Sequence, residues 1–166
     1  METFNQSMIE YRKQLERGVI NKAYKGLMEY IMALRTYLKK KYPDFIISGS
    51  VYFGYMDMTY FSFTPISLNQ RKLKVAFVFN HATFQFEVWL AGYNKQVQSK
   101  YWNYFKEKGW GKYHIVSSTK GVDSIVEHTL VENPDFSDLN SLSNQIEGKG
   151  LKFIGDVEHF LIKNSI

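Results

Sequence analysis

One segment near the middle of the chain combines residue types that can do chemistry. Gln85, Glu87 and Trp89 alternate with apolar neighbours, so in a strand they share the face opposite the apolar row. A carboxylate at mid-strand needs solvent, a cation or a hydrogen-bond partner, because an unpaired buried charge is very costly. Glu87 therefore points either into a wet cleft or at a specific partner. Asp57 raises the same question within an aromatic-rich, otherwise apolar stretch.

These two carboxylates lead to two interpretations. If the side chains of Asp57 and Glu87 converge, they could form a pair for metal binding or for general acid–base catalysis. In the structural alternative, Glu87 pairs with Lys74 across a hairpin and Asp57 is a turn residue. Asp57 and Glu87 are therefore the catalytic candidates, and the sequence does not decide whether the protein is an enzyme.

The segment after the strand, Gly92 to Lys95, has the composition of a helix start that could hold an anion. Free backbone N–H groups, the helix dipole and a lysine would together attract negative charge. Nearby rings, including Trp102, could stack on a planar ligand. The alternative is an ordinary asparagine N-cap, with the rings packed in a second small core. The candidate ligand-binding residues are Glu87, Trp89, Tyr93, Asn94 and Lys95.

Other chemistry-bearing patterns are missing from the sequence. It contains no cysteine, which excludes disulfides, thiolate metal sites and cysteine nucleophiles. It has no phosphate-cradling glycine loop, no paired-histidine zinc motif and no nucleophile elbow. The four histidines lack metal-ligand spacing. The sequence therefore predicts no metal site and leaves any cofactor unknown.

A hairpin followed by a helix must position these residues. Two apolar rows at alternate positions predict two strands joined by a turn over 80–83, and the helix follows from Gly92 and Asn94. The rows are Leu73, Val75, Phe77 and Phe79, then Phe84, Phe86, Val88 and Leu90. Two such rows side by side make one wall of a core.

Helical periodicity dominates both ends of the chain. A short first helix carries the stripe Phe4, Met8, Tyr11 and Leu15 and closes at Gly18. A second carries a continuous apolar seam from Ile20 to Leu38, which we expect to pack on the sheet. Residues 133–135 predict the start of a final helix that runs to near the end of the chain. Its glycines predict a kink or break near 148–150.

The remaining segments are expected to add strands and loops. Ile46–Phe63 is strand, but its pattern does not decide between one bent strand and a hairpin. Pro65–Arg71 is predicted to be a loop and Tyr113–Val116 a short strand. Ser124–Val131 could be strand or helix, and its β-branched residues favour strand.

The predicted fold is a single α+β domain over residues 1–166. It has a largely antiparallel sheet of five or six strands, two N-terminal helices, one helix after the central hairpin and a long C-terminal helix. This order resembles, by topology alone, the core of restriction-endonuclease-like nucleases. Such a site would need a lysine two places after the glutamate. Trp89 stands there instead, so Lys95 would have to supply the cation.

The net charge of +5 is unevenly distributed. Residues 1–120 hold eighteen Lys or Arg against eight Asp or Glu, whereas residues 121–166 hold three against eight. The acidic segment is expected to pack beside the basic body. A nucleic-acid partner is the disfavoured alternative, because no basic cluster beyond Lys39–Lys41 stands out. Without a visible signal peptide or an apolar run long enough to span a bilayer, we expect a cytoplasmic protein that does not enter the membrane.

Three segments, Gly54–Pro65, Phe86–Gln98 and Asn133–Leu139, resemble those of a family of small uncharacterised bacterial proteins, a domain of unknown function. The resemblance covers nearly the whole chain. It implies a bacterial cytoplasmic protein and supplies no activity, so it assigns no residue a role.

Three functional hypotheses follow. The first is a protein that binds a small polar or anionic ligand in an aromatic-lined cleft on the face of Glu87 and Trp89. The second is a metal-dependent hydrolase or nuclease that uses Asp57 and Glu87. The third is an interaction module, or a homodimer, built from the basic N-terminal helices.

Overall fold

The structure is a computed structural model that describes residues 1–164, and within them it contains five α-helices and one six-stranded sheet. In chain order the elements are α1 Phe4–Arg17, α2 Val19–Lys41, β1 Ile46–Ile47, β2 Met58–Thr64, α3 Ile66–Gln70, β3 Leu73–Asn80, β4 Gln85–Gly92, α4 Lys95–Glu107, β5 His114–Ile115, β6 Ser124–Val131 and α5 Leu139–Lys163. The strands pair antiparallel in the order β1-β2-β3-β4-β6-β5. The predicted α+β fold is therefore confirmed.

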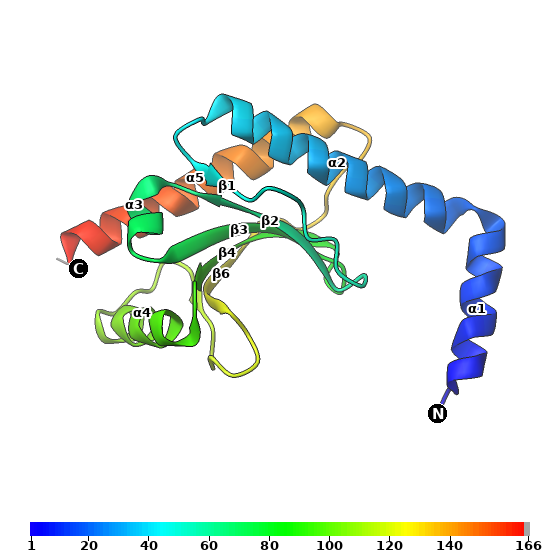
Figure 1. Cartoon of the computed structure of the whole chain (residues 1–166), viewed down its shortest axis with the longest axis horizontal. Helices are drawn as coiled ribbons and strands as arrows, with labels where there is room; N and C mark the ends of the chain where they lie inside the picture. The colour runs from blue at the N-terminus through cyan, green and yellow to red at the C-terminus, as the bar shows by residue number, and fades with distance from the viewer. Residues whose placement is uncertain (165–166) are drawn as a thin grey trace.

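One face of the sheet, which we call the covered face, packs against helices α2 and α5 (Figure 1). Apart from Phe84, the predicted apolar rows of β3 and β4 lie on this face and are buried, and Val75 and Val88 are fully enclosed. Each such side chain contributes roughly 1.5–3 kcal/mol through burial. The two helices also contact each other, because the hydroxyls of Tyr30 and Ser143 lie 3.0 Å apart.

The close approach of α5 to the sheet depends on a glycine. A Cβ atom at Gly150 would lie only 2.4 Å from the Phe77 ring, so the helix touches the strand where its own side chain is missing. The glycines of this segment predicted a kink or break near 148–150. That prediction is wrong, because α5 is one continuous helix from Leu139 to Lys163.

The opposite side of the sheet, which we call the open face, carries α4 at one end (Figure 1). Phe105 of α4 stacks on Phe160 of α5 with ring centroids 5.4 Å apart, which joins α4 to the core at that end. Away from α4, the side chains of Tyr60, Ala76 and Trp89 on this face are partly exposed. Helices therefore pack along one face of the sheet, whereas the other face carries a helix only at one end (Figure 1).

Helix α1 and the first turn of α2 project beyond the sheet (Figure 1). The predicted apolar seam of α2 packs as expected in its C-terminal half, where Ile31, Leu34 and Leu38 are buried. The prediction is wrong at the start of the helix, because Ile20 is 41% exposed. The sheet ends before that part of the helix, so nothing lies beneath it within the described part of the chain.

The structure resolves the two strand assignments that the sequence left open. Ile46–Phe63 contains two strands, β1 and β2, which pair with each other and are joined by a long loop over 48–57. Ser124–Val131 is strand β6, as its β-branched residues indicated.

Three local predictions are wrong. The predicted loop Pro65–Arg71 contains the short helix α3, which buries Leu68. Phe84 has a φ of 56° and is 57% exposed, so it ends the turn instead of extending the core row. The final helix begins at Leu139, because Asp138 caps it by accepting a hydrogen bond from the Ser141 N–H.

Candidate functional site

A cleft of about 820 Å³ opens on the open face of the sheet. Its floor is formed by strands β2, β3 and β4, and its walls by the loop over 48–53, by the loop over 121–123 and by the segment that enters α4. The residues that line it are Ser48, Ser50, Val51, Tyr52, Phe53, Met58, Tyr60, Ser62, Lys74, Ala76, Trp89, Ala91, Gly92, Tyr93, Asn94, Gly121, Val122, Asp123 and Ser124.

The hollow arises because small side chains lie between large ones. Ala76 stands opposite Ser62 on one neighbouring strand and opposite Trp89 on the other, so the middle of the floor is low. At the β2 side the rings of Tyr52 and Tyr60 lie 4.9 Å apart, where the backbone of the loop pairs with the strand. The cleft therefore combines aromatic rings with serine hydroxyls.

Three of the five predicted ligand-binding residues, Trp89, Tyr93 and Asn94, line this cleft. Asn94 is the N-cap of α4, as the structural alternative proposed, and its side chain accepts a hydrogen bond of 2.9 Å from the Val97 N–H. Tyr93 is fixed by its hydroxyl, which donates to the Asn69 side chain. These bonds give the rim of the cleft a defined shape.

Lys95, the fourth predicted residue, points at a loop and lies outside the lining of the cleft. Its ammonium donates to the carbonyls of Thr119 and Val122 and lies 3.6 Å from the Asp123 carboxylate. Gln98, one turn later and buried, donates to the Val122 carbonyl at 2.8 Å. Lys95 and Gln98 thus hold in place the loop that forms one wall of the cleft.

Glu87, the fifth predicted residue, lies on the open face two positions before Trp89, outside the lining of the cleft. It accepts a hydrogen bond of 3.1 Å from the Asn80 amide. Burial raises the pKa of Glu87, and the Asn80 hydrogen bond opposes that increase. The indole N–H of Trp89 approaches the same carboxylate without hydrogen-bond geometry, and this buried N–H has no partner among residues 1–164.

The suggested salt bridge between Glu87 and Lys74 does not form. In the β3–β4 pairing Lys74 stands opposite Ala91, whereas Glu87 stands opposite Val78. The Lys74 ammonium instead lies 4.9 Å from the centroid of the Tyr93 ring. Lys74 therefore brings a positive charge to the cleft, and the carboxylate is left with an uncharged partner.

Asp57 is a turn residue. Its carboxylate accepts a hydrogen bond of 2.9 Å from the Tyr55 N–H, and this bond lowers the pKa of Asp57. Its backbone carbonyl accepts from the His81 N–H, which ties the loop to the β3–β4 turn. This side chain has a structural task at the end of the sheet.

The structure does not bring the two catalytic candidates together. Tyr60 and Glu87 both stand opposite Val78, on either side of it, so Asp57 lies two strand spacings away and three residues further along. That offset corresponds to roughly 14 Å between backbones. Among residues 1–164 there is also no group of three His, Asp or Glu side chains placed to hold one metal ion.

Most of the residues that line the cleft were not predicted from the sequence. Tyr60 and Ser62 alternate with the buried Phe61 and Phe63, and this alternation could have placed them on the open face. The loops over 48–53 and 121–123 have no periodicity that would predict where they fold. Lys74 was noticed in the sequence but was assigned to the wrong partner.

Comparisons with known proteins give a family and no activity. No curated protein and no solved structure matches the chain. Within residues 1–164, no helix has the length and apolar character needed to cross a membrane. A family described as "Domain of unknown function (DUF7000)" matches residues 4–161, which is nearly the whole sequence. The chain therefore belongs to the DUF7000 family of domains of unknown function.

Proposed function

We propose that this protein binds a small polar or anionic molecule in the cleft of the open face. The observation that carries the proposal is the cleft itself, which at about 820 Å³ lies within the range of roughly 300–1,000 Å³ common for small-molecule sites. Its lining also has the composition of such sites, with aromatic surface and a few placed polar groups.

The lining residues suggest how a ligand would be held. Trp89 and Tyr60 offer ring surface to a planar or sugar-like group. Ser48, Ser50 and Ser62 offer hydroxyls that can both donate and accept hydrogen bonds. Lys74 lies at the cleft and would attract a negative charge.

The two predicted residues outside the lining have supporting roles in this proposal. Lys95 would act by holding the loop over 119–123, which forms a wall of the cleft. Glu87 would hold neighbouring side chains in position through its hydrogen bond with Asn80. Trp89 would make the direct contact with the ligand. The resemblance of three segments to bacterial proteins supports a bacterial, cytoplasmic setting for this binding.

A ligand screen tests the proposal directly. The probes are nucleosides, nucleotides, sugar phosphates and small carboxylates, with tryptophan fluorescence and thermal stability as readouts. A member that binds in the cleft should change the fluorescence of Trp89 and raise the melting temperature with its concentration. If no member of the panel changes either readout at millimolar concentration, the proposal loses its support.

A filled cleft provides the control for location. Ala76→Met places a larger side chain on the cleft floor and should abolish binding of any ligand found in the screen. Ala33→Met adds the same side chain at an exposed position of α2 and should leave binding unchanged. Equal binding by both variants would place the ligand elsewhere.

The metal-dependent hydrolase stays a prediction without a supporting observation. The separation of roughly 14 Å between Asp57 and Glu87 exceeds what one ion can bridge with oxygen distances of about 2.0–2.6 Å. Titration with Mg²⁺ or Mn²⁺ in a DNA cleavage assay is the direct measurement.

A further inference from the structure

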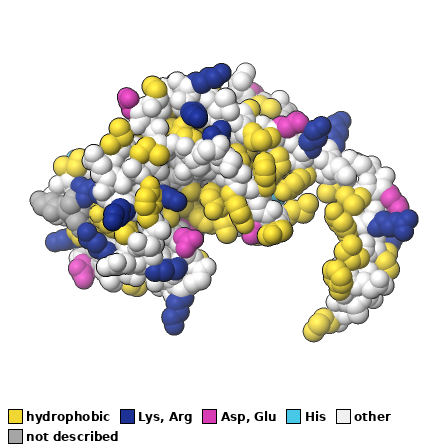
Figure 2. Space-filling model, viewed as in Figure 1, with side chains coloured by type: hydrophobic (Ala, Val, Ile, Leu, Met, Phe, Trp, Pro, Cys, Tyr) yellow, Lys and Arg dark blue, Asp and Glu magenta, His cyan; other side chains and the backbone are white. Residues whose placement is uncertain are grey.

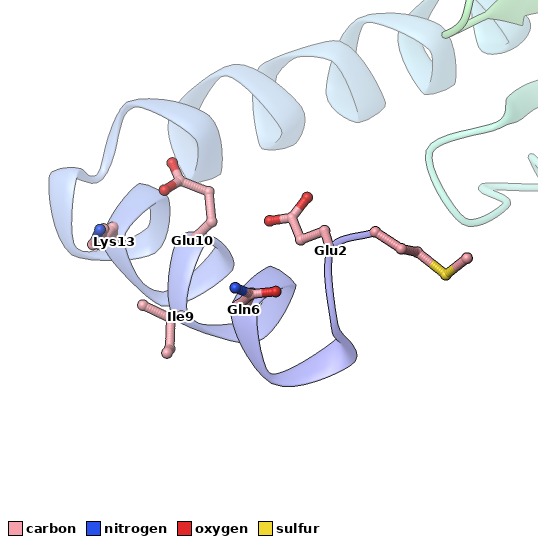
Figure 3. A pocket seen from close by; sticks show the side chains of 6 residues that line it. Glu2, Gln6, Ile9, Glu10 and Lys13 are labelled. Carbon is pink, nitrogen blue, oxygen red and sulfur yellow. The ribbon is translucent and has the colours of Figure 1, made fainter.

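Two hollows on the molecule differ in what encloses them. Glu2, Gln6, Ile9, Glu10 and Lys13 line a shallow one, and all of them belong to α1 or to the residues just before it (Figure 3). Because α1 stands apart from the body of the molecule, this hollow has no opposite wall within residues 1–164 (Figure 2). The cleft of the open face takes its lining from strands β2, β3 and β4 and from the loops beside them, so it can surround a ligand.

The floor of the cleft places three kinds of side chain around one small residue. Ala76 is that residue, with Ser62 opposite it on β2 and Trp89 opposite it on β4. Neighbouring strands are about 5 Å apart, so the hydroxyl and the indole belong to backbones roughly 10 Å from each other. Lys74 lies on the same face of β3 two residues before Ala76, or roughly 7 Å along the strand. A hydroxyl, an indole and an ammonium therefore surround Ala76 on three sides.

The serine side of the cleft has hydroxyls that are available to a ligand. The Ser48 hydroxyl donates to the Ser50 carbonyl at 3.0 Å and accepts from the Ser62 N–H at 3.1 Å, which fixes the backbone on this side. The hydroxyls of Ser50 and Ser62 make no hydrogen bond to another residue within residues 1–164, and both residues line the cleft. A hydroxyl can donate and accept at the same time. This side therefore suits a ligand group that carries hydroxyls of its own.

The cleft carries one positive charge that lacks an acidic partner. The charged residues of its lining are Lys74 and Asp123. Lys74 forms no salt bridge within residues 1–164, whereas the Asp123 carboxylate lies 3.6 Å from the Lys95 ammonium. Asp123 is followed by Ser124, which lies two strands away from Lys74 at the same level of the sheet. A single phosphate therefore suits this end of the cleft, because further phosphates would bring negative charge close to Asp123.

We propose that the ligand of this cleft is a nucleoside 5′-monophosphate, an inference that rests on the binding function proposed above. The ribose lies over Ala76 and directs its base toward Trp89 and its 5′-phosphate toward Lys74. The 2′- and 3′-hydroxyls face Ser50 and Ser62. Bases stack on aromatic side chains, and a lysine ammonium binds phosphate as a point charge. A ribose with three kinds of substituent therefore matches the three kinds of side chain around Ala76.

Isothermal titration calorimetry of the full chain with a nucleotide and its fragments tests the assignment. AMP should bind roughly tenfold more tightly than adenosine or ribose 5-phosphate, because each fragment leaves one side of the site without a partner. ATP should bind less tightly than AMP, because its outer phosphates would approach the Asp123 carboxylate. These ligands together report on the base, the sugar and the phosphate separately.

Variants of the lining assign each end of the nucleotide to a side chain. Lys74→Gln should weaken AMP binding by roughly ten- to a hundredfold and leave adenosine binding unchanged, because only AMP carries the phosphate. The matched control Lys40→Gln removes the same charge at an exposed position of α2 outside the cleft and should bind AMP like wild type. Ser62→Ala should weaken AMP binding by roughly three- to tenfold and leave binding of 2′,3′-dideoxy-AMP unchanged. Thermal unfolding verifies that all three variants are folded.

The outcomes separate this assignment from the binding function itself. Equal affinity for AMP and ribose 5-phosphate, tighter binding of ATP, or an equal loss of AMP and adenosine binding in Lys74→Gln would overturn the nucleoside monophosphate. So would a failure of AMP, GMP, CMP and UMP to bind while another molecule of the screen binds wild type and not Ala76→Met, but the cleft would then remain a binding site. If no molecule of the screen binds, the assignment and the proposed function both fail.

Discussion

The covered and open faces of the sheet share the same strands but differ in what packs on them. On β2, Phe63 points to the covered face and is fully buried, whereas its neighbour Ser62 lines the cleft. On β4, Val88 is fully buried between Glu87 and Trp89, which are half-buried on the open face. Because successive side chains of a strand point to opposite faces, a buried residue that stabilises the fold is followed by one that lies on the open face.

The difference extends to the carboxylate nearest each face. Glu147 of α5, on the side of the covered face, accepts hydrogen bonds from the hydroxyls of Tyr37 and Tyr42, and its carboxylate lies 2.6 Å from the Lys41 ammonium. Glu87 on the open face has the single amide of Asn80. Glu147 therefore has three donors around its carboxylate, whereas Glu87 has one.

Truncating a ring on the covered face should give the largest effect. Phe63→Ala removes a fully buried side chain and should cost about 3–5 kcal/mol of unfolding free energy, because a cavity remains. Ser62→Ala, one residue away on the open face, should change it by less than about 0.5 kcal/mol. Urea denaturation of both variants gives the comparison. Similar losses from both would show that the open face is also packed.

Adding a methyl group should change stability in opposite directions on the two sides of α5. Gly150→Ala should destabilise the protein by about 1–3 kcal/mol, because the new Cβ would meet the Phe77 ring. Gly155→Ala meets open space and should stabilise it by roughly 0.5–1 kcal/mol through helix propensity. Thermal unfolding of the two variants should move in opposite directions, and a loss from both would argue against the close approach at Gly150.

The covered face was the predictable half of the molecule. Alternation over 73–79 and the apolar seam of α2 encode burial directly, and the sheet follows from them. The sequence also identified Asn94 as the start of a helix, because its side chain can cap free N–H groups. Local sequence patterns therefore predict structure correctly where the residues within one segment determine its burial or its helix cap.

The sequence predicted less where several local signals competed or where distant segments meet. Pro134 suggested a helix start, but Asp138 provides the actual cap with its side chain. Phe84 continued the alternation of β4 and yet occupies a left-handed turn position. The cleft itself is lined by two loops, over 48–53 and over 121–123, that lie far apart in the sequence. The spacing of residues within one loop cannot predict that a second, distant loop lines the same cleft.

Acid titration should distinguish the two carboxylates. Burial alone would raise the pKa of Glu147, but the bonds from Lys41, Tyr42 and Tyr37 outweigh it and leave this pKa below its usual value. A lowered pKa contributes stability that is present above the unfolded pKa and is lost as pH falls through the folded pKa. Glu147→Gln should therefore cost about 1.5–3 kcal/mol at pH 7, because hydrogen bonds to a charged group are lost. Its difference from wild type, measured by urea denaturation, should shrink as the pH falls below about 4.

Glu87 should give the smallest effect and the opposite sign. Burial raises its pKa, so the folded protein favours the protonated carboxyl more than the unfolded chain does. The resulting stability is complete below the unfolded pKa and is lost as pH rises through the folded pKa. Glu87→Gln should therefore equal wild type near pH 3 and exceed it at pH 7 by at most about 0.5 kcal/mol. A loss of stability at pH 7 would mean that the hydrogen bond from Asn80 outweighs the cost of burying this carboxylate, and the contrast with Glu147 would fail.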